Sequence, residues 1–430
     1  MQPMRSLAFA IAVTISFCFA ASAQAQLQVG AAAIDVTPEK FPVLINGGFN
    51  SRTGEPKDIF ARAIVVSDGQ MQVAIVVTDS CMLPKDLIDG AKQLASERTK
   101  IPTDRIMISA THTHTAPSSM GALGTDADET YTPYLRIKLA EAIITAQRNL
   151  APAKVGFGSA DAAEFTALRR WILRPGQMRE DPFGNMSVRA SMHTAKNNLP
   201  NVTGESGPED PQLSVISFQS PEGRPIALLA NFSMHYFGGG GAADYFGAYC
   251  KSLEEKLNQK SADAAPFVAV MSHGCSGDIW RVDYRTGTNQ TFEGFVEGMV
   301  ERTEQALATI KYESDATLAM AETRLELDYR TPTNERLTWA KGILEKMGDR
   351  LPKTKEEVYA REQVILHERQ STEVVLQALR IGDMAIATTP NETYALTGLK
   401  LKRRSPLKNT MVIELANGGD GYIPPPEQHF

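Results

Sequence analysis

Apolar runs of strand length alternate with segments of helical spacing along this sequence, and the alternation limits the folds open to it. Gln72–Thr78 and Arg105–Ser109 are apolar runs, and Pro84–Lys100 between them carries apolar residues at helical spacing. Two strands joined through a helix are expected to lie parallel in one sheet, because parallel neighbours need such a crossover. The same alternation returns between residues 213 and 311. The sequence therefore predicts an α/β fold.

A hairpin expected just before this unit makes the predicted sheet mixed. Residues 59–67 and 72–78 have strand character, and Asp68-Gly69 between them is a turn dipeptide typical of antiparallel hairpins. Since we find neither an internal repeat nor a Pro/Ser-rich linker, residues 26–430 are expected to form one large single domain. Its core would be a mixed β-sheet flanked by helices. The polar stretch 174–207 lacks any period and is interpreted as a lid on the substrate side.

The N-terminal segment has the pattern of a cleavable export signal. Arg5 precedes the apolar stretch Leu7–Ala21, and Ala23-Gln24-Ala25 is an A-x-A cleavage pattern. Residues 1–25 are therefore expected to be a signal peptide, and the mature chain to be periplasmic or secreted. The formal net charge of -6 argues against nucleic acid as a partner. No later stretch is long and apolar enough for an integral membrane span.

Two histidines follow the second apolar run at a spacing that suits a metal. His112 and His114 stand in the segment Thr111-His112-Thr113-His114-Thr115-Ala116-Pro117. On an extended backbone this spacing directs both imidazoles to one face, and neutral imidazole is a common zinc ligand. A histidine pair satisfied by ordinary hydrogen bonds is about equally expected for an isolated His-x-His, so the motif alone leaves both interpretations open.

Further reactive side chains also stand directly after apolar runs. They are Asp79, His235, His273, Asp278 and Glu392. Ligands of open α/β sheets bind at the carboxyl ends of strands, so these side chains are expected to converge there. Four of the seven histidines occupy such positions, which favours a metal site built from residues distant in the chain. The other three, at positions 193, 367 and 429, are interpreted as surface residues.

The order of several motifs resembles that of the neutral (alkaline, non-lysosomal) ceramidases, over nearly all of residues 27–428. The motifs are Thr111–Pro117, Asn231–His235, Asp244-Tyr245-Phe246-Gly247, Ser276-Gly277-Asp278 and Pro390-Asn391-Glu392. The resemblance implies a zinc-dependent amidase with an α/β catalytic domain and a place in sphingolipid or other lipid metabolism. It implies that zinc is bound by His112, His235 and Glu392, with His114 beside them, and that Arg169 contacts the substrate.

The chain departs from the pattern of this family in three places. The family's fourth zinc ligand is a tyrosine that is expected beyond Phe430, and Tyr422, the nearest substitute, lies too early in the motif. The family's G-D-x-S motif, whose serine is tied to catalysis, reads Gly277-Asp278-Ile279-Trp280 here. Residues 26–430 would thus be a catalytic domain that lacks its C-terminal end and any immunoglobulin-like domain.

Three functional hypotheses follow. The first is an exported zinc-dependent hydrolase that cleaves an N-acyl amide, of ceramide or a related small-molecule or lipid substrate, by zinc-bound water, with His114 or Asp278 as proton shuttle. The second is a serine hydrolase that uses Ser276 with His273, although no G-x-S-x-G motif surrounds this serine. The third is a catalytically inactive binding protein on the same fold, which Trp280 in place of the family's serine favours.

Overall fold

The first sheet of the computed structural model, which describes residues 26–46, 48–257 and 265–429, has five strands. They are β1 (Gln28–Asp35), β4 (Phe60–Ser67), β5 (Gln72–Thr78), β6 (Ile106–Ala110) and β7 (Ala151–Pro152), in the order β6-β5-β4-β1-β7. The predicted hairpin forms, because β4 and β5 pair antiparallel. The predicted parallel pair of β5 and β6 forms as well, so this sheet is mixed. The signal peptide expected over residues 1–25 lies outside the described residues.

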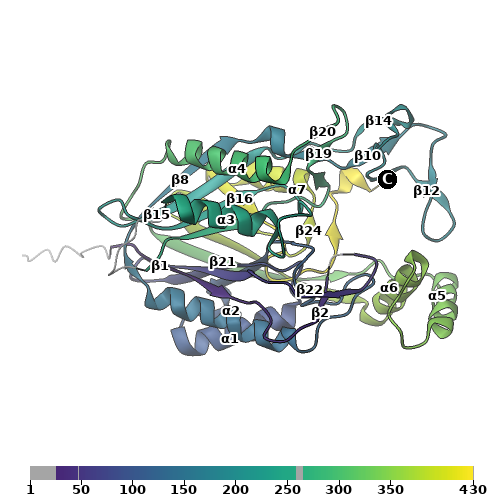
Figure 1. Cartoon of the computed structure of the whole chain (residues 1–430), viewed down its shortest axis with the longest axis horizontal. Coiled ribbons are helices and arrows are strands. Elements are labelled where there is room, and N and C mark those ends of the chain that lie inside the picture. Colours follow the sequence, from purple (N-terminus) through teal and green to yellow (C-terminus); the bar gives the residue numbers. More distant parts are fainter. Residues whose placement is uncertain (1–25, 47, 258–264, 430) are drawn as a thin grey trace, which may run out of the picture.

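Two helices cover the outer face of the first sheet: α1 (Lys85–Thr99) and α2 (Tyr131–Arg148) (Figure 1). α1 ends where Lys100 adopts a left-handed conformation, with φ of 66°. The C-terminal turn of α2 lies directly on β1, where a Cβ atom on Gly30 would be only 2.2 Å from the carbonyl oxygen of Ala146. Only glycine fits this contact without displacing the helix.

A second sheet lies on the other side of the core. Its strands are β8 (Lys154–Asp161), β15 (Gln212–Gln219), β16 (Pro225–Phe232) and β17 (Val268–His273), in the order β17-β16-β15-β8. Helices α3 (Asp244–Leu257) and α4 (Phe292–Leu307) cover its outer face (Figure 1). β16 and β17 are parallel and α3 lies between them in the chain, as the alternation of apolar runs and helical spacing over residues 213–311 predicted.

A third sheet contains β21 (Leu318–Asp328), β22 (Ser371–Ile381), β23 (Met384–Thr388) and β25 (Asn409–Ile413), in that order. β22 and β23 form a hairpin at Gly382, whose φ is 60°, and α7 (Ala395–Arg404) leads from β23 to the parallel β25. The helical pair α5 (Asn334–Met347) and α6 (Lys355–Arg369) connects β21 to β22 and lies at one end of the molecule (Figure 1). A capping box between Thr354 and Glu357 begins α6.

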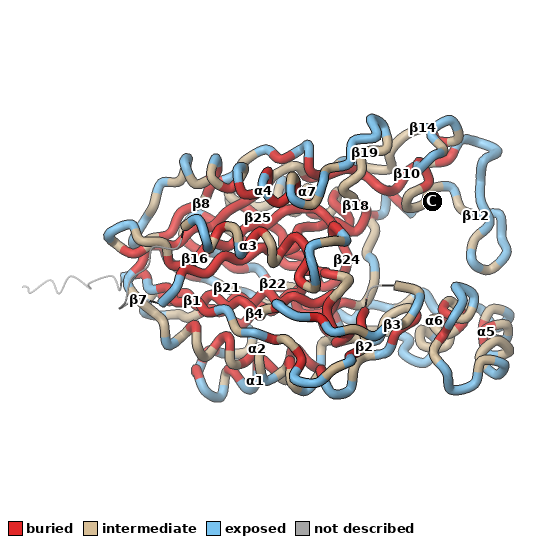
Figure 2. The backbone as a smooth tube through the Cα atoms, in the orientation of Figure 1, coloured by how far each residue is buried: buried red, intermediate tan, exposed pale blue. Residues whose placement is uncertain are grey.

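Side chains alternate along the strands between two apolar layers. On β4, Ala63 and Val65 pack toward α1 and α2, whereas Ile64 and Val66 face the space between the sheets. That inner layer takes residues from all three sheets, and a further layer joins the second sheet to α3 and α4. Figure 2 shows the resulting buried centre along the strands. The predicted α/β architecture, a mixed β-sheet core flanked by helices, is confirmed.

The segment after β25 connects the first two sheets and brings their strand ends together. The backbone N–H of Asn417 donates to the carbonyl of Ile108 on β6, and the N–H of Ala110 donates to Leu415. On the other side, the N–H of Glu414 donates to the carbonyl of His273 at the end of β17. The carboxyl ends of β6, β17 and β25 therefore meet, and the loops that follow them lie in one region.

The remaining strands of the described residues are short. They are β2 (Val43–Ile45), β3 (Arg52–Gly54), β9 (Ala167–Leu168), β10 (Arg170–Leu173), β11 (Arg179–Glu180), β12 (Met186–Val188), β13 (Ala190–Met192), β14 (Val202–Glu205), β18 (Ile279–Trp280), β19 (Val282–Asp283), β20 (Thr288–Asn289), β24 (Glu392–Thr393) and β26 (Tyr422–Ile423). The four 3-10 turns are Thr103–Arg105, Ala163–Phe165, Leu199–Asn201 and Pro426–Gln428. The stretch 174–207, interpreted from the sequence as a lid on the substrate side, contains β11 to β14 and has many exposed residues (Figure 2).

Candidate metal centre

His112 is positioned by a sharp turn directly after β6. The N–H of His112 donates to the carbonyl of Ser80 over 2.9 Å, and its φ of 68° places the backbone in the left-handed region. The expectation of an extended His-x-His segment is therefore wrong at this residue. The ring is oriented by its own Nδ1, which lies 2.9 Å from the carbonyl oxygen of Cys81. That bond leaves Nε2 directed into the site.

Three donor atoms from distant segments meet at this point. His112 Nε2 lies 3.1 Å from His235 Nε2 and 3.2 Å from Glu392 Oε2, and His235 Nε2 lies 3.8 Å from the same carboxylate oxygen. His235 follows β16, and Glu392 begins β24. The three residues are exposed by only 1%, 2% and 5%. The expected convergence of the three predicted zinc ligands is thus present in the geometry.

The donor set fits a zinc ion. Four ligands about 2.1 Å from zinc in a tetrahedron are separated by about 3.4 Å, and the three separations here lie around that value. Two imidazoles with one carboxylate is a ligand set of catalytic zinc sites, which leave the remaining position for water or substrate. Glu392 Oε2 is buried beside His112 Nε2, and a buried carboxylate is costly unless a positive charge neutralises it.

The charges at the three side chains support the same assignment. Burial lowers the pKa of His235 well below its usual value, and the positive charge of Arg169 lowers it further, so the ring is neutral. Burial alone would raise the pKa of Glu392, but His112, Tyr422 and Arg169 together outweigh it and lower this pKa to about 2. Glu392 raises the pKa of His112 despite burial, so a metal ion would replace the proton that otherwise joins the pair.

His114 lies beside the three donors, as expected. Its Nε2 is 3.1 Å from His112 Nε2, and its ring stacks on Tyr236 with centroids 3.7 Å apart. Together with Cys81 and His112 it forms a second group of potential ligand atoms. Because His114 is only partly buried, it also lies between the buried donors and the solvent.

Tyr422 reaches the same site, although the sequence interpretation placed the tyrosine ligand beyond Phe430. Glu392 and Tyr422 are opposite each other in the parallel pair of β24 and β26. The Tyr422 hydroxyl hydrogen bonds to Glu392 and lies 3.1 Å from Arg169 Nη2. In the sequence, Tyr422 stands out only as a tyrosine directly after the turn-forming segment 418–421. This position does not indicate a role unless the pairing of β24 with β26 is known.

Arg169 and Asp278 occupy different environments. Arg169 is almost buried, and its Nη2 donates to the carbonyl of Gly277 over 2.8 Å as well as to Tyr422, so its guanidinium faces the donor group. The Asp278 carboxylate instead accepts the N–H of Ala395 at the start of α7, over 2.9 Å. Burial raises the pKa of Asp278 to about 6. This contact gives Asp278 a structural role at the start of α7.

Ser276 and His273 do form a contact, as the serine hydrolase hypothesis requires. Ser276 Oγ lies 2.6 Å from His273 Nε2, and Glu414 Oε1 lies within 3.2 Å of both Ser276 Oγ and His273 Nδ1. All three side chains are completely buried. A nucleophile must reach its substrate, so this geometry favours a structural hydrogen-bond network beneath the metal centre.

His193, interpreted as a surface residue, lies in the wall next to the site. Its Nδ1 is 2.5 Å from the Tyr284 hydroxyl, and the edge of its ring contacts Trp280, with centroids 5.3 Å apart. Trp280 also lies 6.1 Å from His235, centroid to centroid. No periodic pattern marks His193, because its position depends on a left-handed turn with φ of 57° inside an irregular segment.

Comparisons with known proteins identify the fold. No protein-family model matches the sequence, and no curated protein matches it. The chain is similar to the solved structure of neutral ceramidase from Pseudomonas aeruginosa, with a TM-score of 0.65 and 16% identity, over 93% of this chain and 68% of that one. It is also similar to a structure described as ceramidase complexed with C2, with a TM-score of 0.64 and 15% identity, over 94% of this chain and 70% of that one. The predicted resemblance is confirmed: the chain has the neutral ceramidase fold.

Proposed function

We propose that this protein is a zinc-dependent hydrolase that cleaves an N-acyl amide. The observation that carries the proposal is the meeting of His112, His235 and Glu392, whose donor atoms lie 3.1 to 3.8 Å apart in a buried site. The fold supports it, because both similar structures are described as ceramidases. A zinc ion bound there would supply Lewis-acid polarisation of the substrate carbonyl and activation of water near neutral pH.

The other side chains of the site would position the substrate and move protons. The Arg169 guanidinium and the Tyr422 hydroxyl are neighbouring donors, 3.1 Å apart, for the oxygen that gains negative charge as the carbonyl is attacked. His114 has its Nε2 beside the donor group and is partly open to solvent, so it would pass a proton to the departing amine. Because the Tyr422 hydroxyl also hydrogen bonds to Glu392, the alternative role for Tyr422 is that of a fourth ligand, and the Tyr422→Phe variant distinguishes the two roles.

Export belongs to the same proposal. The basic, apolar and small-residue pattern of residues 1–25 supports a cleavable signal peptide and a periplasmic or secreted enzyme. Among the described residues, no helix has both the length and the apolar character needed to cross a bilayer. N-terminal sequencing of protein recovered from the periplasm or the medium should begin at Gln26. An uncleaved N-terminus on cytoplasmic protein would contradict this part.

Elemental analysis and hydrolysis assays test the enzyme. We expect about one zinc per chain in the purified protein and hydrolysis of N-acyl amides that a chelator abolishes and added zinc restores. A panel that includes ceramide, shorter N-acyl amines and acylated sugars would locate the substrate. Hydrolysis that is unchanged after complete removal of metal would contradict the proposal.

A catalytically inactive binding protein is the second candidate, and one observation favours it. Trp280 follows Gly277-Asp278-Ile279, and its ring lies against both His235 and Tyr236, so it covers one side of the donor group. Protein with one zinc per chain that binds N-acyl ligands but turns over none of them would support this candidate over the enzyme. Replacing Trp280 by serine in such a protein would test whether the indole blocks the reaction.

A further inference from the structure

A cavity of about 870 Å³ has Trp280 in its wall, and the Trp280 ring also lies near His235 of the proposed metal centre. One wall is the segment from His193 to Pro200, and the other is formed by Trp280, Arg281 and the turn that follows them. Trp280 belongs to both places, because its ring centroid is 5.3 Å from that of His193 and 6.1 Å from that of His235. Trp280 is therefore the residue that the cavity wall shares with the surroundings of the proposed metal ligands.

The cavity wall carries cations that no carboxylate neutralises. Arg281 donates from Nε to the carbonyl of Phe237 over 2.9 Å and from Nη1 to the side-chain amide of Asn289, and both acceptors are uncharged. Lys196 is exposed and takes part in no ion pair within the described part of the chain. The described residues that line the cavity include neither aspartate nor glutamate. In a chain with a net charge of -6, this wall is locally positive.

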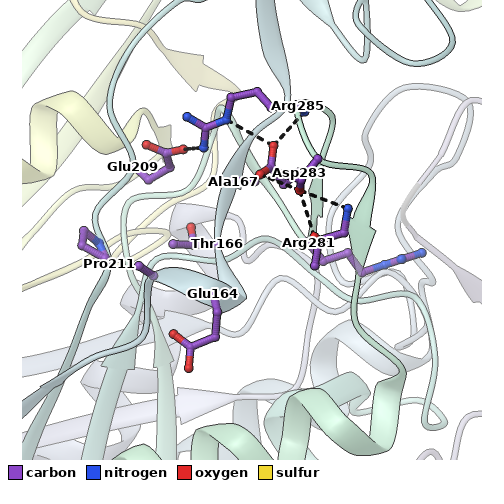
Figure 3. Close-up of a pocket in the computed structure, with 11 residues that line it drawn as sticks. Glu164, Thr166, Ala167, Glu209, Pro211, Arg281, Asp283 and Arg285 are labelled. Carbon is purple, nitrogen blue, oxygen red and sulfur yellow. Dashed lines mark hydrogen bonds and ion pairs between the residues drawn. The ribbon is translucent and has the colours of Figure 1, made fainter.

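A neighbouring pocket shows the opposite arrangement (Figure 3). There Arg285 is paired with Asp283 and Glu209, at 3.3 and 3.4 Å, and with Glu205 at 3.3 Å. Arg281 lines this pocket too, but it forms none of these ion pairs. The two arginines therefore form a useful comparison. Carboxylates balance the charge of Arg285, whereas the hydrogen-bond acceptors of Arg281 are uncharged.

Resting on the proposed function, we propose that this cavity binds a carboxylate on the amine side of the substrate, so that the preferred substrates are N-acyl amino acids. Arg281 and Lys196 would bind the carboxylate, and the planar faces of Trp280 and Tyr284 would contact the rest of the group. In the reaction, water adds its oxygen to the acyl carbon as the C–N bond breaks, and the released amine nitrogen gains a proton. The products are a fatty or short-chain acid and a free amino acid.

Matched substrates test the charge preference directly. N-acylglycine, the N-acylethanolamine with the same acyl chain, and its O-phosphate differ only in the group that would enter the cavity. With the zinc-loaded full chain we expect kcat/KM to be about tenfold higher or more for N-acylglycine than for N-acylethanolamine, as a charge-assisted contact implies. Equal values, or a clear preference for the neutral amide or for the phosphate, would overturn the assignment of a carboxylate site.

Variants of the two arginines locate the effect. Arg281→Gln should remove most of the preference for N-acylglycine through a higher KM, and Arg281→Lys should retain part of it because the charge remains. Arg285→Gln is the matched control and should leave the preference unchanged. A preference that survives Arg281→Gln and Lys196→Gln together, in protein that unfolds at the wild-type temperature, would overturn the proposal.

A binding measurement separates this inference from the proposed enzyme activity. Titration calorimetry of N-acylglycine with metal-stripped wild-type protein should give binding that weakens as salt rises and that Arg281→Gln weakens about tenfold. If no amide is hydrolysed but this binding is found, the enzyme proposal fails and the carboxylate site stands. If neutral amides are hydrolysed and N-acylglycine neither binds nor reacts better, the site fails and the enzyme proposal stands.

Discussion

His112 and His235 are 123 positions apart in the sequence, yet their Nε2 atoms lie 3.1 Å from each other. Two buried ring nitrogens this close need either a shared proton or a shared metal ion. The neutral state that burial gives His235 and the carboxylate of Glu392 beside the pair favour the metal. This relationship gives the first prediction.

His235→Ala should remove zinc from the protein. Because it deletes one of three ligands, we expect the affinity for zinc to fall by about a hundredfold or more, measured by chelator competition and elemental analysis. His367→Ala, which changes an exposed histidine on α6, is the control and should keep its zinc. Unchanged zinc content in His235→Ala would exclude this site as the place where zinc binds.

Tyr422→Phe tests the hydroxyl that pairs with Glu392 and Arg169. We expect kcat to fall by about a hundredfold, because removing one donor or ligand at a reacting oxygen typically has an effect of this size. Loss of zinc affinity together with kcat would identify Tyr422 as a ligand, whereas loss of kcat alone would identify it as a donor to the substrate. Tyr359→Phe on α6 should be neutral, and a fully active Tyr422→Phe would remove Tyr422 from the site.

A buried ion pair supports the strand that leads into the site. Arg62 Nη1 lies 2.9 Å from Asp79 Oδ2, both side chains are nearly inaccessible, and Asp79 also accepts the N–H of Phe60. Asp79→Ala leaves the guanidinium buried and unpaired, so we expect the free energy of unfolding to fall by about 3–5 kcal/mol. Urea denaturation in the presence of chelator measures this.

The control for this pair is the surface pair of Lys138 and Glu141 on α2. Glu141→Ala should change the free energy of unfolding by less than about 1 kcal/mol. Replacing both Arg62 and Asp79 by apolar residues should restore part of the stability that Asp79→Ala loses. Equal effects of Asp79→Ala and Glu141→Ala would contradict the role of the buried pair.

Lys92, on the inner side of α1, gives a pH-dependent prediction. Burial lowers its pKa from 10.5 to about 8, so the charged form destabilises the folded state. Below pH 8 both the folded and the unfolded chain hold the proton on Lys92, so the full destabilisation by the buried charge is present. Between pH 8 and 10.5 the unfolded chain keeps the proton that the folded chain has lost, so stability from this group rises with pH.

Lys92→Met should therefore stabilise the protein by about 3 kcal/mol at pH 7, and the gain should shrink toward zero near pH 10.5. The comparison of wild type and variant in urea at the two pH values cancels the titration of all other groups. A gain that is the same at both pH values would show that packing, and not the buried charge, is responsible.

Much of the fold could be predicted from the sequence because the signals were local. The turn at Asp68-Gly69, the helical spacing of 84–100 and the apolar run before His112 each act within a few residues, and the hairpin, α1 and β6 formed as expected. The division of the strands into three sheets was not predictable. All three sheets contribute apolar residues to one shared layer, so the apolar pattern of a single strand does not indicate which strands it pairs with.

The site was predictable in part for the same reason. His112, His235 and Glu392 follow strand ends, and strand ends converge in α/β sheets. Tyr422 was judged to lie too early in the motif, because its place depends on a two-residue pairing with Glu392. His193 was interpreted as a surface residue, because its place depends on a left-handed turn. Asp278 follows a strand as well, but its carboxylate accepts a hydrogen bond at the start of α7. No sequence pattern distinguishes an aspartate with this structural contact from a catalytic one.

The scattered origin of the donor group has a consequence for biosynthesis. His112 and His235 leave the ribosome long before Glu392 and Tyr422, so a growing chain offers two imidazoles without the carboxylate that completes the set. If these residues bind zinc as proposed, the complete ligand set would form only once β24 and β26 are paired. Zinc would then bind after the rest of the fold has formed. Incomplete chains on the ribosome would bind zinc only weakly.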